Sequence, residues 1–420
     1  MLHTQNNITL TGDGRLQVNV FAGNIGMPAE SAHVRVSLSD NRTGLVGEWV
    51  TDSSGQTDML TLPAPPVEFS MQPDRPQPYS SYDIFVTMNG YEPVYVRGVQ
   101  IFPNTTAIQS VDLHPVNISG VQPEVIPITP PTLWGSYPAK VHEAVVKPLP
   151  PSKGYAVLPD PVIPEYIVVH DGVPTNRSAK DYWVPFKDYI KNVASCEIYS
   201  TWPEETIRAN VLAILSFTLN RVYTEWYRSK GYGFTITSST AFDHAFTYGR
   251  NIFREISTIV DDLFTTFITK PDIRQPLLTQ YCDGRKVQCP NWMTQWGSKA
   301  LGDQGYSAIN ILKNAYGNDI YLMQAQKVEG IPLSFPGIRL QVGSRGPNVR
   351  VVQEQLNAIS RHYPAIPRLV EDGIYGSATK ASVEKFQKIF NLPSSGVTDF
   401  ATWYKLSLIY VAVTRMGELR

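Results

Sequence analysis

Glu197 is the residue whose type and spacing point most directly to chemistry. Apolar residues at helical spacing precede it, at Phe186, Tyr189, Ile190 and Val193. Because Glu197 follows Val193 by four positions, it falls on the same buried stripe of the predicted helix. Burial and the negative end of the helix dipole both disfavour a charged carboxylate there. The pattern therefore predicts a raised pKa for Glu197, which a general acid needs near neutral pH.

Simpler interpretations of Glu197 stay open at this stage. A carboxylate at a helix end also pairs with a nearby cation, here Lys191 or Arg208, or stays in solvent. Glu204 and Glu205 are competing carboxylates, but they stand at the start of the next predicted helix. The positive end of that helix dipole and capping explain both of them.

Length and composition limit the classes of protein. The chain has 420 residues, which predicts two to four domains. Charged residues make up 17% and the net charge is −1, so the sequence carries no basic field for nucleic acid. We expect no membrane span, because no apolar run approaches the roughly 20 residues that one needs. No secretory signal is recognisable at the N-terminus, so the route of export stays open.

Four segments differ in pattern, and together they predict a multidomain fold. Residues 1–114 alternate apolar and polar positions between turns, which predicts an all-β sandwich. Residues 115–164 contain twelve prolines and form an extended connector, part of which packs on a neighbour because it carries residues such as Trp134. Residues 165–330 mix short strands and amphipathic helices, which predicts an α+β domain. Residues 336–420 show three amphipathic helices separated by glycine turns.

The last segment carries three elements that occur together. They are Leu340-x-x-Gly343-x-x-Gly346-x-x-Val349, Asp372-Gly373-Ile374-Tyr375-Gly376 and Val383-x-x-Phe386-Gln387. Although Tyr375 replaces the usual Phe, the set resembles the type 1 peptidoglycan-binding domain. The resemblance implies a small three-helix module that binds the cell wall, with peptidoglycan glycan strands as partner.

The middle segment carries three further elements in a fixed order. They are Glu197 followed by Trp202-Pro203 and a helix, then Ser239-Thr240 with Asp243-His244, and finally Gln295-Trp296-Gly297. This order resembles the stage II sporulation protein D (SpoIID/LytB) domain. The resemblance implies a lytic transglycosylase that cuts the MurNAc–GlcNAc bond of peptidoglycan, with Glu197 as the catalytic residue. The sequence departs from the family in lacking an Arg near Leu215 and in having Arg208 for Lys and His244 for Gln.

A single carboxylate suits this reaction. It first protonates the leaving oxygen and then takes the proton of the sugar's own C6 hydroxyl, so no second carboxylate is needed to activate water. Tyr199 and Trp202 flank the proposed acid and are predicted to stack on sugar rings. The remaining candidates for substrate binding are Ser239, Thr240, His244, Gln295 and Trp296.

The first segment also resembles a known family. The turn at residues 51–55, the strand pattern around it and Gly90-Tyr91-Glu92-Pro93 are similar to the carboxypeptidase-regulatory or transthyretin-like domain. That resemblance implies scaffolding or adhesion, with other wall or spore proteins as partners. We expect the protein in the cell wall, in the spore or outside the cell.

Three alternatives remain. Cys196 and His244 would serve an amidase or peptidase if their side chains meet. Cys282, Cys289 and His244 would hold a structural zinc, but Cys-x6-Cys lacks the tight spacing of most zinc sites, so a disulfide or two free thiols, without a cofactor, is favoured. A non-catalytic wall or spore protein would keep Glu197 closed off, with no groove wide enough for a sugar chain.

Overall fold

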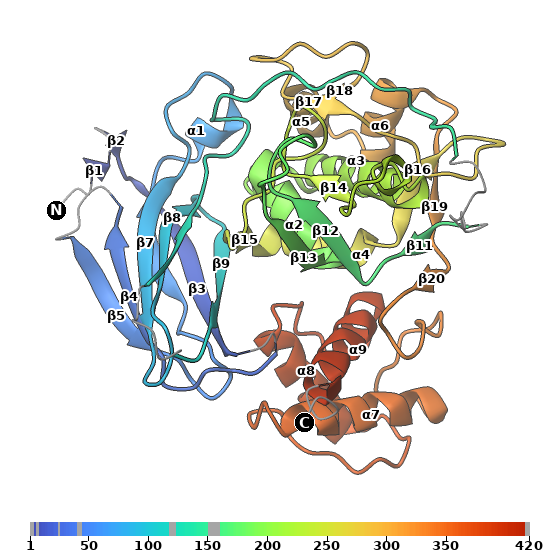
Figure 1. Cartoon of the computed structure of the whole chain (residues 1–420). Coiled ribbons are helices and arrows are strands. Elements are labelled where there is room, and N and C mark those ends of the chain that lie inside the picture. Colours follow the sequence, from blue (N-terminus) through green and yellow to red (C-terminus); the bar gives the residue numbers. More distant parts are fainter. Residues whose placement is uncertain are drawn as a thin grey trace.

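The computed structural model describes residues 4–5, 8–23, 26–39, 44–116, 123–149 and 160–415. Three bodies are visible in Figure 1: a β-sandwich coloured blue, a mixed middle body coloured green to orange, and a red group of C-terminal helices. The connector, coloured teal, runs from the sandwich across the top of the middle body.

Two sheets form the N-terminal body. One contains, in spatial order, β15 (Ile252–Phe253), β9 (Thr106–Leu113), β3 (Gly12–Ala22) and β6 (Leu60–Ala64). The other contains β10 (Glu124–Pro127), β8 (Val94–Ile101), β7 (Ser80–Thr87), β4 (His33–Leu38) and β5 (Leu45–Val50). Shorter elements are β1 (Thr4–Gln5), β2 (Ile8–Thr9) and α1 (Glu68–Met71). Leu16, Val18 and Val20 are fully buried, as their alternation predicts.

Two strands of this body come from outside residues 1–114. β15 belongs to the middle body and pairs with β9, whereas β10 belongs to the connector and pairs with β8. Asn251, beside β15, exchanges two hydrogen bonds with the backbone of Gln100. The connector is therefore not a free spacer: its described parts pack on both bodies, while residues 117–122 and 150–159 lie outside the described residues.

The middle body is built around α3 (Glu204–Tyr223), which is buried over most of its length. The helices that contact it are α2 (Phe186–Glu197), α4 (Arg254–Leu263), α5 (Gln295–Asp303) and α6 (Ala308–Tyr316). A three-stranded sheet of β13 (Asp181–Pro185), β12 (Tyr166–His170) and β14 (Ile236–Thr237) packs on α2. The predicted helices on either side of Trp202 are confirmed.

Smaller elements complete this body. The paired strands are β11 (Val162–Ile163) with β20 (Lys327–Val328), β16 (Thr266–Thr269) with β19 (Tyr321–Gln324), and β17 (Tyr281–Cys282) with β18 (Met293–Thr294). A single 3-10 turn, η1 (Arg228–Lys230), follows α3.

A buried charge cluster joins α2 to α4. Lys187 and Lys191 donate to the two carboxylate oxygens of Asp261, at 2.9 and 2.7 Å. All three side chains are almost completely buried. The pair of lysines overcomes the effect of burial and holds the pKa of Asp261 well below its usual range.

Three helices form the C-terminal body: α7 (Pro347–Ser360), α8 (Ser377–Ile389) and α9 (Phe400–Arg415). Leu356, Val383 and Phe386 are fully buried, so the three-helix prediction is confirmed. The Tyr375 hydroxyl donates to the carbonyl of Gly396 at 3.1 Å. Helix α9 also packs on the middle body near α4.

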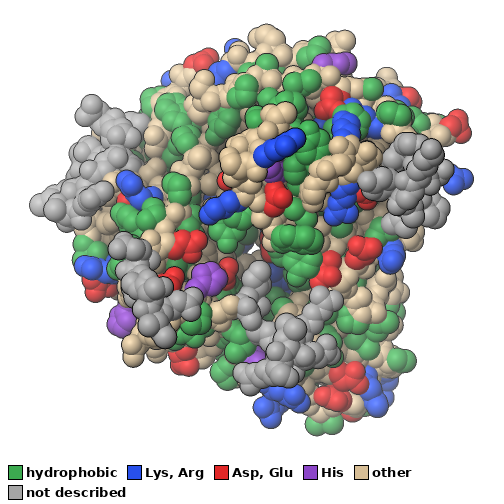
Figure 2. Space-filling view, viewed as in Figure 1, with side chains coloured by type: hydrophobic (Ala, Val, Ile, Leu, Met, Phe, Trp, Pro, Cys, Tyr) green, Lys and Arg blue, Asp and Glu red, His purple; other side chains and the backbone are tan. Residues whose placement is uncertain are grey.

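The surface agrees with the near-neutral composition. Figure 2 shows basic and acidic side chains interspersed over the visible face. Among the described helices none is long and apolar enough to cross a membrane.

Candidate active site

Glu197 is the last residue of α2, and its side chain is only 3% exposed. The backbone N–H of Ala245 donates to Glu197 Oε1 at 2.7 Å. The side-chain amide of Gln295 donates to the Glu197 carbonyl at 3.0 Å. One carboxylate oxygen is therefore held in place, and the helix end is tied to the start of α5.

The electrostatic surroundings of Glu197 agree with the sequence prediction. Burial raises the pKa of Glu197, and this effect outweighs Lys140, the Tyr281 hydroxyl and the Ala245 N–H, which all lower it. The buried Tyr281 hydroxyl lowers the pKa of Glu197 even though the distance and angles between the two groups are not those of an ordinary hydrogen bond. The cations weighed as partners from sequence are engaged elsewhere, because Lys191 binds Asp261 and Arg208 binds Glu204.

The space beside Glu197 is small in this conformation. The cavity has a volume of about 50 Å³. Its walls come from the connector, from the Ser239-Thr240 loop and from the region of β17 and α5, and they comprise Thr132, Gly135, Tyr137, Pro138, Lys140, Thr240, Tyr281, Cys282, Asp283, Lys286, Val287 and Gln295. Ligand pockets usually have volumes of about 300–1,000 Å³. A sugar ring does not fit beside Glu197 until part of this wall moves.

The connector is the part of the wall that comes from elsewhere in the chain. The Thr132 N–H donates to the Cys196 carbonyl at 2.9 Å, and the Val141 N–H donates to the Ala241 carbonyl at 2.7 Å. Between them, the Lys140 ammonium donates to the backbone carbonyl of Asp243 and lies 4.9 Å from the centre of the Tyr281 ring. The segment 132–141 is thus attached on both sides of Glu197.

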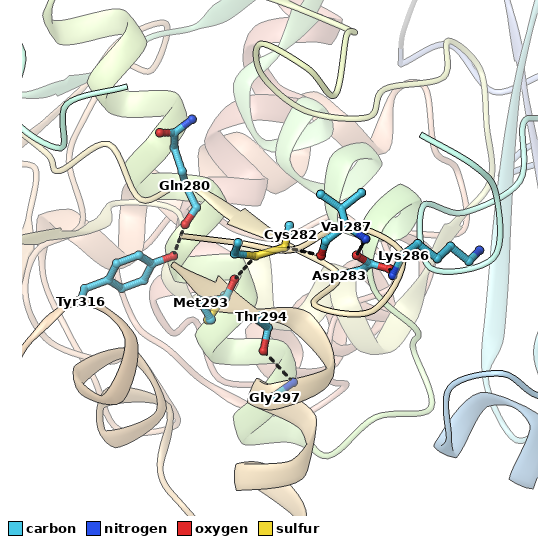
Figure 3. The surroundings of a disulfide bond; sticks show 10 residues. Gln280, Cys282, Asp283, Lys286, Val287, Met293, Thr294, Gly297 and Tyr316 are labelled. Carbon is cyan, nitrogen blue, oxygen red and sulfur yellow. Dashed lines mark hydrogen bonds between the residues drawn. A yellow bond between two sulfur atoms is a disulfide. The ribbon is translucent and has the colours of Figure 1, made fainter. Parts of the chain in front are cut away.

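A disulfide-closed loop holds the same segment from the other side. Cys282 and Cys289 are bonded, and Figure 3 shows Asp283, Lys286 and Val287 in the loop between them. The Asp283 carboxylate accepts the backbone N–H groups of Lys286 and Val287, at 2.8 and 2.9 Å. The Lys286 ammonium then donates to the connector carbonyls of Trp134 and Gly135, at 2.5 and 2.8 Å.

This disulfide bears on the zinc alternative. The sulfurs of Cys282 and Cys289 bind each other, and the Nδ1 atom of His244 lies 3.0 Å from the Tyr189 hydroxyl. In the parts of the chain that are described, no group of three His, Cys, Asp or Glu residues is arranged to hold a metal.

The predicted sugar-stacking residues lie elsewhere than expected. Tyr199 and Trp202 are 2% and 3% exposed and neither lines the Glu197 cavity. The Trp202 indole N–H donates to the carbonyl of Ser70 in the sandwich at 2.9 Å. Trp296 packs 5.1 Å from Trp202, centre to centre. In this conformation Tyr199 and Trp202 form part of the core between two bodies and present no exposed ring face, so their contact with a sugar stays a prediction.

The polar candidates divide into two groups. Thr240 and Gln295 line the Glu197 cavity, as proposed from sequence, whereas Ser239 and His244 do not. His244 is fully buried, and burial lowers its pKa well below its usual value. Its Nδ1 atom lies 3.0 Å from the Tyr189 hydroxyl, and its Nε2 atom has no hydrogen-bond partner among the described residues.

The Cys–His alternative finds no support in the geometry. The Cys196 thiol donates to the Asn192 side chain at 3.6 Å, and the ring of His244 is paired with Tyr189. The two side chains do not form the hydrogen bond that a nucleophile and its base require.

Lys140 and Tyr137 are among the site residues that sequence reasoning missed. The signal for them was indirect: the connector is too apolar for a free linker, and Leu133 is indeed 5% exposed. Nothing in the local sequence says that this segment lies on Glu197, which is more than fifty positions away.

Comparison with known proteins assigns one part of the chain. Residues 345–406 match the family described as "Putative peptidoglycan binding domain". This region comprises α7, α8 and the first part of α9, so the C-terminal body is a peptidoglycan-binding domain and supports association with the cell wall. No curated protein matches the chain.

Solved structures give only distant likenesses. The Bacillus anthracis TIE protein is 15% identical with a TM-score of 0.18, covering 26% of this chain and 17% of that one. GBS52, the minor pilin of Streptococcus agalactiae, is 14% identical with a TM-score of 0.19, covering 27% and 49%. Catechol 1,2-dioxygenase from Acinetobacter sp. ADP1 is 12% identical with a TM-score of 0.17, covering 27% and 58%. This chain spans less than two thirds of each, and none of these likenesses bears on function.

Proposed function

We propose that this chain is a peptidoglycan lytic transglycosylase of the SpoIID/LytB type, with Glu197 as its single acid and base. One observation carries the proposal: a buried glutamate with a raised pKa, fixed through one oxygen, lies in a cavity of a chain that also has a peptidoglycan-binding domain. Once this domain has bound a glycan strand, the encounter of the same strand with Glu197 is intramolecular. The strand is therefore present at a high local concentration.

The chemistry follows from the geometry of Glu197. The Ala245 N–H occupies Oε1, so the proton resides on Oε2. That proton passes to the glycosidic oxygen as the bond from the MurNAc C1 atom to it breaks. The resulting carboxylate takes the proton of the MurNAc C6 hydroxyl while the oxygen of that hydroxyl bonds to C1. The products are a 1,6-anhydro ring and a free chain end, and Glu197 regains its proton.

Substrate entry requires the connector to leave. Residues 132–140 fill the approach to Glu197, and the remaining volume of about 50 Å³ is too small for a pyranose. The departure of the connector removes Lys140, which lowers the pKa of Glu197, but it also reduces the burial that raises this pKa. In this proposal the described conformation is a covered state.

The small volume beside Glu197 also favours a second candidate function, that of a non-catalytic wall-binding or spore protein. In that case the connector stays in place and Glu197 is a buried residue of the fold. The two candidates differ in one outcome, namely whether opening the connector yields cleavage.

The experiment uses the full chain on intact and peptide-stripped sacculi, with soluble products identified by mass spectrometry. Lys286→Ala removes two hydrogen bonds to the connector and leaves the backbone contacts of the loop in place. We expect anhydro-muropeptides to increase with Lys286→Ala and to vanish in Glu197→Gln/Lys286→Ala. Lys327→Ala, an exposed lysine on β20, is the matched control and should behave as wild type. Absence of product from every variant on both substrates would establish the non-catalytic candidate.

A further inference from the structure

A second and larger cavity lies in the middle body. Its volume is about 380 Å³, within the range of ligand pockets. It shares no lining residue with the cavity at Glu197. Six aromatic residues line it: Tyr166, Trp183, Tyr223, Trp226, Tyr227 and Phe234. This concentration of rings, with charged groups among them, is what sets the cavity apart.

Two of these rings are exposed and share one face of a sheet. Trp183 on β13 is 70% exposed and Tyr166 on β12 is 42% exposed. Trp183 lies opposite Val168, two residues along β12 from Tyr166. Because alternate residues of a strand face the same side and opposed residues share a face, both rings stand on the outer face of the sheet as diagonal neighbours. The pair forms an aromatic platform facing the solvent.

The floor of the cavity is buried and hydrogen-bonded. Val168, Tyr227 and Phe234 form a small buried cluster beneath the platform. The Tyr227 hydroxyl and the Arg221 guanidinium each donate to the Asp243 carboxylate at 2.7 Å. A floor held by buried, charge-assisted hydrogen bonds does not need to be ordered when a ligand binds.

Trp226 has a different role from the platform. The ammonium groups of Lys230 and Lys147 lie 3.1 and 4.0 Å from the centre of its ring. Its indole is therefore engaged by cations. Stacking of a ligand falls to Trp183 and Tyr166.

The charged groups around the cavity narrow the class of ligand. Glu165, Glu225 and Glu329 contribute carboxylates. Two guanidinium groups also line the cavity: Arg228 lies 3.8 Å from Glu225, and Arg221 is already paired with Asp243 and Glu143. An excess of carboxylates disfavours an anion, whereas carboxylates accept hydrogen bonds from hydroxyl groups and the guanidinium of Arg228 donates to a carbonyl. Aromatic faces beside such groups suit a neutral, hydroxyl-rich ring whose C–H face stacks on them.

We propose that this cavity binds pyranose rings of the peptidoglycan glycan strand, with Trp183 and Tyr166 as the stacking platform. The chain itself supplies the reason for this ligand, because its C-terminal domain is a peptidoglycan-binding domain. The inference rests on the glycan strand that the proposed function acts on, but not on cleavage. The cavity is a second holding site on the strand, and two sites on one strand bind more tightly than either alone.

The test measures binding without cleavage. Full-length Glu197→Gln protein is titrated calorimetrically with soluble, peptide-stripped glycan strands. We expect Trp183→Ala in this background to weaken binding by about tenfold, the size of one aromatic contact. Trp183→Phe keeps a stacking ring and should lose less. Tyr306, on the same body, is 43% exposed and so matches Tyr166, which is 42% exposed; Tyr306→Ala is the control for Tyr166→Ala and should not change the affinity.

Each outcome decides the proposal. Unchanged affinity in both Trp183→Ala and Tyr166→Ala overturns it, provided that thermal unfolding shows both variants folded. Binding of free stem peptide that is lost in Trp183→Ala, with glycan binding intact, also overturns it in favour of a peptide site. If the variants lose glycan affinity while no sacculus is ever cleaved, the holding site stands and the transglycosylase proposal fails. If wild-type protein cleaves sacculi while the variants keep their affinity for glycan, the transglycosylase proposal stands and the holding site fails.

Discussion

Ala245 donates its backbone N–H to the carboxylate of Glu197, and two residues earlier the carbonyl of Asp243 accepts the ammonium of Lys140. One short segment therefore binds both the proposed acid and the connector that covers it. The Asp243 side chain is in turn held by Arg221 and Tyr227 in the floor of the aromatic cavity. This segment therefore contacts residues of both cavities, although it lines neither of them and the two cavities have no lining residue in common.

The first prediction concerns the stability of Glu197→Gln. Because burial raises the pKa of Glu197 in the folded state, ionisation destabilises the fold as pH rises above the unfolded pKa. The neutral amide avoids this, so the variant should be more stable than wild type at pH 7. Below the pKa that Glu197 has in the unfolded chain, its carboxyl is protonated in both the folded and the unfolded state of wild type. The difference in stability between variant and wild type should then disappear. Chemical denaturation at pH 4 and pH 7 checks this, and an equal difference at both would contradict it.

The second prediction concerns Lys140→Met. Lys140 is the cation that lowers the pKa of Glu197, so its removal should raise this pKa. The infrared band of a protonated carboxyl should then persist to higher pH than in wild type. The band should be missing from the Lys140→Met/Glu197→Gln variant, which identifies its source. A band that titrates as in wild type would show that Lys140 does not act on Glu197.

The third prediction concerns the disulfide. Ser at both Cys282 and Cys289 removes the closure of a short loop, which should lower the free energy of unfolding by about 2 kcal/mol. The loop carries Lys286, so the connector should lose protection as well. Hydrogen exchange should therefore quicken at residues 283–288 and at 134–140, but not in α7. Faster exchange at the loop alone would mean that the connector is held by its other contacts.

The fourth prediction concerns Asp261. Asp261→Asn leaves Lys187 and Lys191 buried without their counter-charge, which should cost about 3–5 kcal/mol of stability. The pKa of Asp261 is lowered in the folded state, so this contribution is present above the unfolded pKa and is lost as pH falls below it. The difference between wild type and variant should thus shrink in strong acid. A loss of less than about 1 kcal/mol at pH 7 in denaturant titrations would refute the role of the cluster.

Local patterns were sufficient for much of this protein. The alternation at Leu16, Val18 and Val20, the helical stripe that ends at Glu197 and the glycine-separated helices after residue 336 each predicted the element that is found. These patterns work because the periods of strands and helices decide which side chains are buried. The burial of Glu197 could be predicted for the same reason.

Only the tertiary structure decided what surrounds Glu197. Its neighbours Lys140, Tyr281 and Ala245 come from three separate segments, and the predicted ring platforms Tyr199 and Trp202 are covered by the sandwich. Such contacts depend on how whole elements pack, and no local period encodes them. The sequence by itself determined a wall-binding module and a misplaced glutamate; the packing of the connector decided that this glutamate is covered.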